Sequence, residues 1–132
     1  MSSITLTSSV TLSGSSGLDV HDHGAPIPVP AETDATNLIW ELTGTAAQGS
    51  FNAMNATNPG FAWVDTPPSG IFGTPTLGAN GNQITITDNH INSNSGGSWR
   101  YKLCATVNGQ PYSTTASVSP RGTTDNPTIK NN

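Results

Sequence analysis

The sequence predicts an all-β protein, an antiparallel β-sandwich of about seven to eight short strands. Apolar and polar residues alternate in short runs along the 132-residue chain, and this period of two is typical of half-buried strands. Two such runs, 98–107 and 112–118, flank Asn108-Gly109, the dipeptide most typical of a tight hairpin turn. The 14 glycines and 10 prolines interrupt the chain at strand-sized intervals, and no segment has the apolar spacing of an amphipathic helix.

The N-terminal part predicts one long or bent strand, one short strand and an extended edge segment. Residues 4–12 place apolar side chains at even positions, apart from one serine, with Ser or Thr between them. After the glycine- and serine-rich break at 13–17, Leu18 and Val20 resume the alternation briefly. Prolines then occupy alternate positions of 26–30. Because proline has no backbone N–H donor, this segment is expected at a sheet edge.

The next part predicts a central strand followed by a poorly patterned region. In residues 37–42, three large apolar side chains share one face. We therefore expect a central strand in which the indole of Trp40 is buried. Residues 43–58 are small and polar, with only Phe51 and Met54 as apolar anchors. We expect a loop or an irregular edge there.

Three further segments lead toward the hairpin. Phe61 and Trp63 share one face of a short apolar run. Residues 67–75 are rich in proline, glycine and serine and predict turns, with the isoleucine or the phenylalanine of this segment filling the core from a loop. A strand is predicted over 83–88 with two isoleucines pointing inward, followed by a loop over 89–97.

The run before the hairpin turn has two faces of different character. Its odd-numbered residues are aromatic or apolar and point inward, whereas the opposite face exposes Arg100, Lys102 and Cys104. That face therefore carries half of the four basic residues of the chain. The predicted core consists of Leu38, Trp40, Leu42, Ile84, Ile86, Trp99, Tyr101, Leu103, Ala105 and Val107.

Several of these features resemble immunoglobulin-like domains. Residues 97–103 are similar to the Gly-x-Tyr-x-Cys-x-Val strand of that fold, and Trp40 matches its strand with an inward tryptophan. Trp99 stands at the tyrosine-corner position, and Tyr101 stands where a disulfide cysteine would be. Since Cys104 is the single cysteine, the resemblance is to the wider group of immunoglobulin-like sandwiches and not to antibody domains.

A closer resemblance is to the small bacterial DP-EP family, over most of the chain. It rests on the order of seven short motifs: Val29-Pro30-Ala31-Glu32-Thr33, Ile39-Trp40-Glu41-Leu42, Gly70-Ile71-Phe72, Thr87-Asp88-Asn89, Trp99-Arg100-Tyr101, Gly109-Gln110-Pro111-Tyr112 and Pro127-Thr128-Ile129-Lys130-Asn131. The resemblance implies a bacterial immunoglobulin-like sandwich. This family has no assigned reaction, so the resemblance supplies no catalytic residue.

Length and composition bound the domain organisation and the partners. We expect one sandwich domain over 1–120 and a polar tail over 121–132 that pairs as an edge strand. With eight acidic and four basic residues, the net charge is −4. Such a chain cannot lay a basic stripe along a phosphate backbone, which excludes nucleic acid as a partner. Only 9% of residues are charged, so copies repel one another weakly, and we expect a homo-oligomer or a protein partner.

The sequence also bears on the compartment. No run approaches the roughly 18 apolar residues that a membrane span needs, so no membrane span is predicted. The first residues lack the basic start and apolar stretch of a signal peptide. The cytoplasm is therefore the default expectation, although a trimmed chain or leaderless export would give the same pattern.

The best candidate for a metal site is His21-Asp22-His23. Histidines at i and i+2 of an extended segment project to one side, and His90 would supply a third nitrogen for zinc or copper. The alternative is an exposed loop whose polar side chains face water.

No catalytic residue is predicted, and we expect a protein without enzymatic activity. The neighbouring cations of Cys104 would lower its pKa and favour the thiolate, but no motif couples it to a histidine base. We therefore favour an inert, half-buried thiol. The remaining acidic pairs lie in polar or proline-rich segments, and the nucleophile elbow and phosphate-binding loop motifs are absent.

Two functions from different classes remain. In the first, the chain is a structural or assembly module that pairs through its strand edges and neutral faces. In the second, it is a ligand-binding module, for carbohydrate or a metal ion, with Trp63, Tyr112, Asp88 and Asn92 as contact residues. The burial of Trp63 discriminates between them, because a core tryptophan cannot stack on a sugar.

Overall fold

The longest strand, β9 (Gly97–Val107), organises the sheet of the computed structural model. The structure describes residues 5–13, 17–20, 27–29, 35–78, 80–90, 96–114 and 128–131. Strand β9 pairs with β10 (Gln110–Ser113) and β11 (Thr128–Asn131) along one edge. Along its other edge it pairs with β5 (Ser50–Phe51) and β6 (Phe61–Trp63). One strand therefore joins four others, of which β5, β6 and β11 come from distant parts of the sequence.

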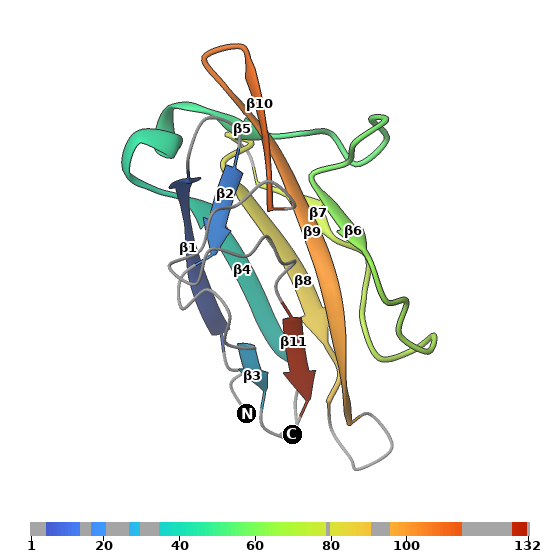
Figure 1. Ribbon diagram of the computed structural model, residues 1–132. Helices are drawn as coiled ribbons and strands as arrows, with labels where there is room; N and C mark the ends of the chain where they lie inside the picture. Colours follow the sequence, from blue (N-terminus) through green and yellow to red (C-terminus); the bar gives the residue numbers. More distant parts are fainter. Residues whose placement is uncertain are drawn as a thin grey trace.

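The remaining strands continue the sheet on both sides (Figure 1). The order is β3-β11-β9-β10-β2-β1-β4-β8-β7. The strands not yet introduced are β1 (Thr5–Ser13), β2 (Gly17–Val20), β3 (Ile27–Val29), β4 (Thr36–Leu42), β7 (Thr76–Leu77) and β8 (Gln83–Asp88). Because the N–H of Phe51 in β5 donates to the carbonyl of Gly81, just before β8, at 2.7 Å, the sheet nearly closes into a barrel.

The all-β prediction is confirmed, but the purely antiparallel one is wrong. Strands β1 and β4 pair in parallel over six residues, from Thr5 opposite Asn37 to Val10 opposite Leu42. Strands β10 and β2, and β11 and β3, are parallel as well. The physical reason is that side-chain alternation has the same period in both strand directions. The pattern therefore identifies inward residues but not the direction of the neighbouring strand.

The hairpin and the central strand are confirmed. Asn108 and Gly109 both have positive φ, 53° and 77°, and the antiparallel register begins with Gln110 opposite Val107. Strand β4 lies between β1 and β8, with buried and half-buried residues in strict alternation. Residues 44–48 form a 3₁₀ helix, η1 (Gly44–Gln48). In the part of the chain that the structure describes, no helix has the length and hydropathy to cross a membrane.

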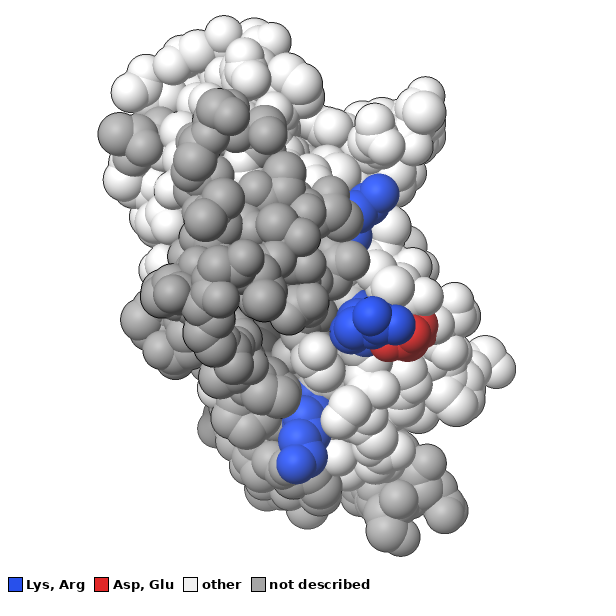
Figure 2. All heavy atoms as spheres, in the orientation of Figure 1, with Lys and Arg blue, Asp and Glu red and all other residues white. Residues whose placement is uncertain are grey.

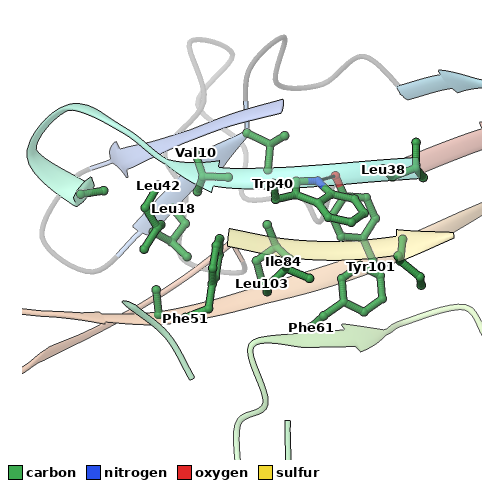
Figure 3. Packing of buried hydrophobic residues seen from close by; sticks show 14 of the residues in the cluster. Val10, Leu18, Leu38, Trp40, Leu42, Phe51, Phe61, Ile84, Tyr101 and Leu103 are labelled. Atoms are coloured by element: carbon green, nitrogen blue, oxygen red, sulfur yellow. Dashed lines mark hydrogen bonds between the residues drawn. The ribbon is translucent and has the colours of Figure 1, made fainter. Parts of the chain in front are cut away.

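The core is organised around Trp40 and Tyr101 (Figure 3). The indole Nε1 of Trp40 donates to the hydroxyl of Tyr101 at 2.8 Å, with both side chains fully buried. The Phe61 ring stacks on Tyr101, with centroids 5.3 Å apart and planes 9° apart. Nine of the ten predicted core residues are buried: Leu38, Trp40, Leu42, Ile84, Ile86, Tyr101, Leu103, Ala105 and Val107.

Trp99 is the exception, and its prediction as a core residue is wrong. It has the inward parity of Tyr101 but lies near the end of β9, opposite Ile129 of β11, and is only partly buried. Its indole covers Gly97, where a Cβ atom would lie 2.8 Å from the ring. Trp99 therefore lies on the face that the alternation predicts, but the buried core ends before this part of β9.

The C-terminal segment takes an interior place in the sheet. Strand β11 lies between β9 and β3 and not at an edge, and its Ile129 is fully buried. Residues 121–127 of the predicted tail lie outside the described residues.

Candidate functional site

Basic side chains form a row on one face of the molecule (Figure 2). Lys102 and Arg100 of β9 and Lys130 of β11 make up this row, which we call the basic row. Arg100 and Lys102 are two residues apart on β9 and so project to the same face. Lys130 joins them because it lies opposite Ser98, which has the same parity. The row therefore results from strand alternation on β9 and from the register of β11.

Asp65 holds Arg100 in this row. The Nε and Nη2 of Arg100 donate to Oδ2 and Oδ1 of Asp65 at 2.8 and 3.1 Å. The backbone N–H of Arg100 also donates to Oδ2, at 3.2 Å. The side-chain hydrogen bonds from Arg100, followed by the backbone one, lower the pKa of Asp65. The Arg100 side chain remains 56% exposed, so the pair fixes its position without removing it from the surface.

Polar side chains close one end of the core, where β4, β8 and β11 meet. Thr36, Asp88, His90 and Asn131 are all buried. The Nδ2 of Asn131 donates to Oδ1 of Asp88 at 3.0 Å. Burial raises the pKa of Asp88 to about 6, while the Asn131 hydrogen bond and the nearby His90 act in the opposite direction. Asp88, which we predicted as a ligand contact, therefore lies inside the protein with no exposed surface.

A chain of aromatic rings leads from the core to the surface. Trp63 meets Phe61 edge-on, with centroids 5.0 Å apart, and tilts against Phe72 at 4.7 Å. Phe72 in turn meets Trp99 edge-on at 5.5 Å. Trp63 is partly buried against the core, so it is neither a core residue nor a flat exposed platform. Its neighbours on both sides reduce the area available for stacking on a sugar.

The structure does not bring the other predicted site residues together. Tyr112 lies opposite Ala105 on β9 and Trp63 lies opposite Tyr101, on different edges of that strand. His21, His23 and Asn92 lie outside the described residues, so zinc or copper binding stays a prediction. Among the residues that the structure describes, no group of three His, Cys, Asp or Glu side chains could hold a metal ion.

Cys104 is more deeply buried than the half-buried thiol that we predicted, so the face of β9 that we expected to expose Arg100, Lys102 and Cys104 does not expose the cysteine. Residues 103–105 are buried on both faces of β9, so the alternation of exposure is interrupted there and resumes at Thr106. Burial raises the pKa of the Cys104 thiol, and the smaller effect of Lys102 does not reverse this. The thiol form is therefore favoured, and the inertness of Cys104 stays a prediction.

We expect Cys104 of the folded protein to react with a disulfide reagent at least about tenfold more slowly than in the unfolded chain, because a thiolate must form and be reached. Thiol labelling followed by absorbance, in buffer and in concentrated urea, measures both rates. Equal rates in the two solvents would show that this thiol is accessible in the folded state.

Comparisons with known proteins gave no relative. No family model matches the chain, no curated protein matches it, and no solved structure matches it. The features that point to a function are therefore the basic row, the aromatic chain and the buried polar end of the core.

Proposed function

We propose that this chain is a non-enzymatic assembly module whose basic row binds the acidic surface of a second copy. The observation that carries the proposal is the alignment of Lys102, Arg100 and Lys130 on one sheet face (Figure 2). Outside this face and Asp65, the sequence holds seven acidic residues, of which Asp88 is buried, and one basic residue. A copy therefore offers opposite charge to the row, which steers association and fixes orientation.

The composition supports association between copies. Only 9% of the residues in the chain are charged, so repulsion between copies is weak. A contact between a basic face and a differently placed acidic face is heterologous, and such contacts generate rings or open chains of subunits. The module would thus contribute one repeated contact to a larger particle.

The family resemblance is part of the same proposal. The buried pair of Trp40 and Tyr101 supports an immunoglobulin-like strand arrangement, because the disulfide of immunoglobulin domains packs on a tryptophan at that place. Membership in the DP-EP family stays a proposal that rests on the sequence motifs alone. A second candidate function, carbohydrate binding, is favoured by the partly exposed rings of Trp63 and Trp99 with Phe72 between them. Stacking on a neutral sugar would not need the basic row.

The assembly proposal predicts salt-dependent self-association. In sedimentation velocity at about 20 mM salt the average mass should rise with protein concentration, and at about 500 mM salt it should fall to the monomer, because salt screens exposed charges. Lys102→Glu with Lys130→Glu should remain monomeric in both. Lys102→Arg with Lys130→Arg, which keeps the charge, is the matched control and should associate.

A wild-type chain that stays monomeric at low salt and high concentration would contradict the proposal. So would association that both double variants retain. Association unaffected by salt would favour an apolar contact, such as one through Val64 and Leu77, the exposed large apolar residues of the described part.

A further inference from the structure

The tip of the hairpin between β9 and β10 is an asparagine followed by a glycine. Figure 1 shows this turn projecting beyond the neighbouring strands. Asn108, Gly109 and Gln110 are all exposed. In the part of the chain that the structure describes, Asn108 is the one residue other than glycine with a positive φ, at 53°. The turn therefore presents an exposed carboxamide next to a residue that has no side chain.

An asparagine side chain can react with the backbone nitrogen of the residue that follows it. The nitrogen attacks Cγ and closes a succinimide ring, while the Cγ–Nδ2 bond breaks and Nδ2 leaves as ammonia with the proton that the backbone nitrogen loses. Water then opens the ring at either carbonyl, which gives aspartate or isoaspartate. Asparagine is accordingly a heat-labile residue. Glycine hinders the attack least, because it has no Cβ atom.

The chain holds a second asparagine–glycine pair, Asn80-Gly81, just before β8. Asn80 is exposed as well, so exposure does not distinguish the two pairs. The N–H of Gly81, whose nitrogen would attack, donates to the carbonyl of Gly78 at 3.0 Å, and the carbonyl of Gly81 accepts from the N–H of Phe51 at 2.7 Å. A Cβ at Gly81 would lie 3.0 Å from the Cβ of Ser50. The attacking nitrogen is therefore held in a turn that also closes the sheet.

The hairpin tip lacks this protection. Among the described residues, no hydrogen bond involves the N–H of Gly109. A Cβ at Gly109 would meet no atom within 4 Å. In a tight hairpin turn, the N–H that closes the turn belongs to the residue after the two central ones. Here that residue is Gln110, which lies opposite Val107, so the nitrogen of Gly109 stays outside the ladder.

We propose that Asn108 is a site of spontaneous deamidation in the folded protein, with water as the co-reactant, and that Asn80 is protected until its turn opens. The reaction changes the covalent structure at the end of the longest strand and is independent of the assembly function.

The two products affect the hairpin differently. Aspartate tolerates the left-handed conformation about as well as asparagine does, so it keeps the turn and adds a negative charge. Isoaspartate continues the chain through its side chain and adds a backbone atom. A tight turn has no room for this atom, so the register of Gln110 opposite Val107 is lost. Because Ser113 of β10 pairs with Gly17 of β2, the link between β9 and β2 should loosen as well.

Tryptic digestion separates the two sites. Trypsin cleaves after lysine and arginine, so peptide 103–121 contains Asn108 as its only asparagine, and Asn80 lies in peptide 1–100. The protein is kept in weakly alkaline buffer at physiological temperature, folded or in concentrated guanidinium chloride, and fragment ions locate each mass gain. In the folded protein, Asn108 should change from amide to carboxyl mass at least about tenfold faster than Asn80, since Asn80 reacts only after local opening. In the denaturant the two rates should be similar.

Two variants assign the reaction and its effect. Asn108→Gly is the matched control, because a Gly-Gly pair also forms this turn and has no carboxamide, so its peptide 103–121 should keep its mass. Asn108→Asp carries the charge without the longer backbone, so it should unfold in urea close to the fresh protein. The isoaspartate fraction, separated by chromatography, should unfold at a lower urea concentration than either.

The wild-type chain alone decides where the reaction occurs. A peptide 103–121 that keeps its mass in the folded protein, while the denatured chain deamidates there, would overturn the proposal. Equal rates at Asn80 and Asn108 in the folded protein would also overturn it. So would a mass gain that Asn108→Gly retains, because Gln110 would then be its source. An isoaspartate fraction as stable as the fresh protein would contradict the loss of register.

Discussion

Replacing Trp40 by alanine should lower the free energy of unfolding by about 3–5 kcal/mol, the largest effect expected of any single substitution in this chain. Trp40 is fully buried, and its ring lies 5.0 Å from Tyr101 and 5.3 Å from Phe61. The substitution would leave a cavity at the centre of the core and remove the donor to the Tyr101 hydroxyl. Urea unfolding followed by far-ultraviolet circular dichroism measures the loss.

Two further variants help to assign the loss of stability to the missing side-chain volume or to the missing hydrogen bond. Trp40→Phe keeps an aromatic ring but removes the indole N–H, and should cost less than the alanine variant. Trp99→Ala is the matched control, because that tryptophan is only partly buried at the end of β9. Equal losses for Trp40→Ala and Trp99→Ala would show that the core is centred elsewhere.

Gly49→Ala should lower the free energy of unfolding by about 1–3 kcal/mol, although it adds only a methyl group. A Cβ atom at Gly49 would overlap a methyl carbon of Val107 and lie 2.5 Å from the carbonyl oxygen of Thr106. Val107 is buried and Thr106 pairs with Ser50 at the contact of β5 and β9. Since β5 also bonds to the turn before β8, the new methyl group would force open the nearly closed sheet.

Gly73→Ala is the control for this prediction. A Cβ there would make an ordinary contact of 3.6 Å with Thr87, so its effect should be small. Thermal unfolding of both variants against the wild type is sufficient for the comparison. If Gly73→Ala is as damaging as Gly49→Ala, the close approach of η1 and β9 is not the cause.

The strands with long alternating patterns could be predicted, and the short ones could not. The pattern is visible over the seven residues of β4 and the eleven of β9. Strands β5 and β7 have two residues each, which is too short for a period of two to appear. The direction of each strand could not be predicted either. The parallel pairing of β1 with β4 depends on the chain that connects them and not on the alternation of apolar and polar residues in either strand.

The candidate site was predictable in part. The alternation on β9 placed Arg100 and Lys102 on one face, but the addition of Lys130 depends on the register of β11. The burial of Asp88 had a visible signal, since it continues the inward series of Ile84 and Ile86. That series ends in a polar residue, and strand alternation alone does not distinguish a buried aspartate from the start of a loop. Asn131, its partner 43 residues away, has no signal in the local sequence.

The central position of β9 also governs how this chain can fold. Strands β5 and β6 precede β9 in the sequence, whereas β10 and β11 follow it, and all four take β9 as a neighbour. Strands β5 and β6 therefore lack the strand with which they pair until residues 97–107 have been synthesised. Contacts between residues so far apart in the sequence close long loops. The chain loses this conformational entropy before the contacts stabilise it, which slows folding. Folding should therefore be slow beside that of a helical bundle of equal length, with β9 as the strand on which the sheet condenses.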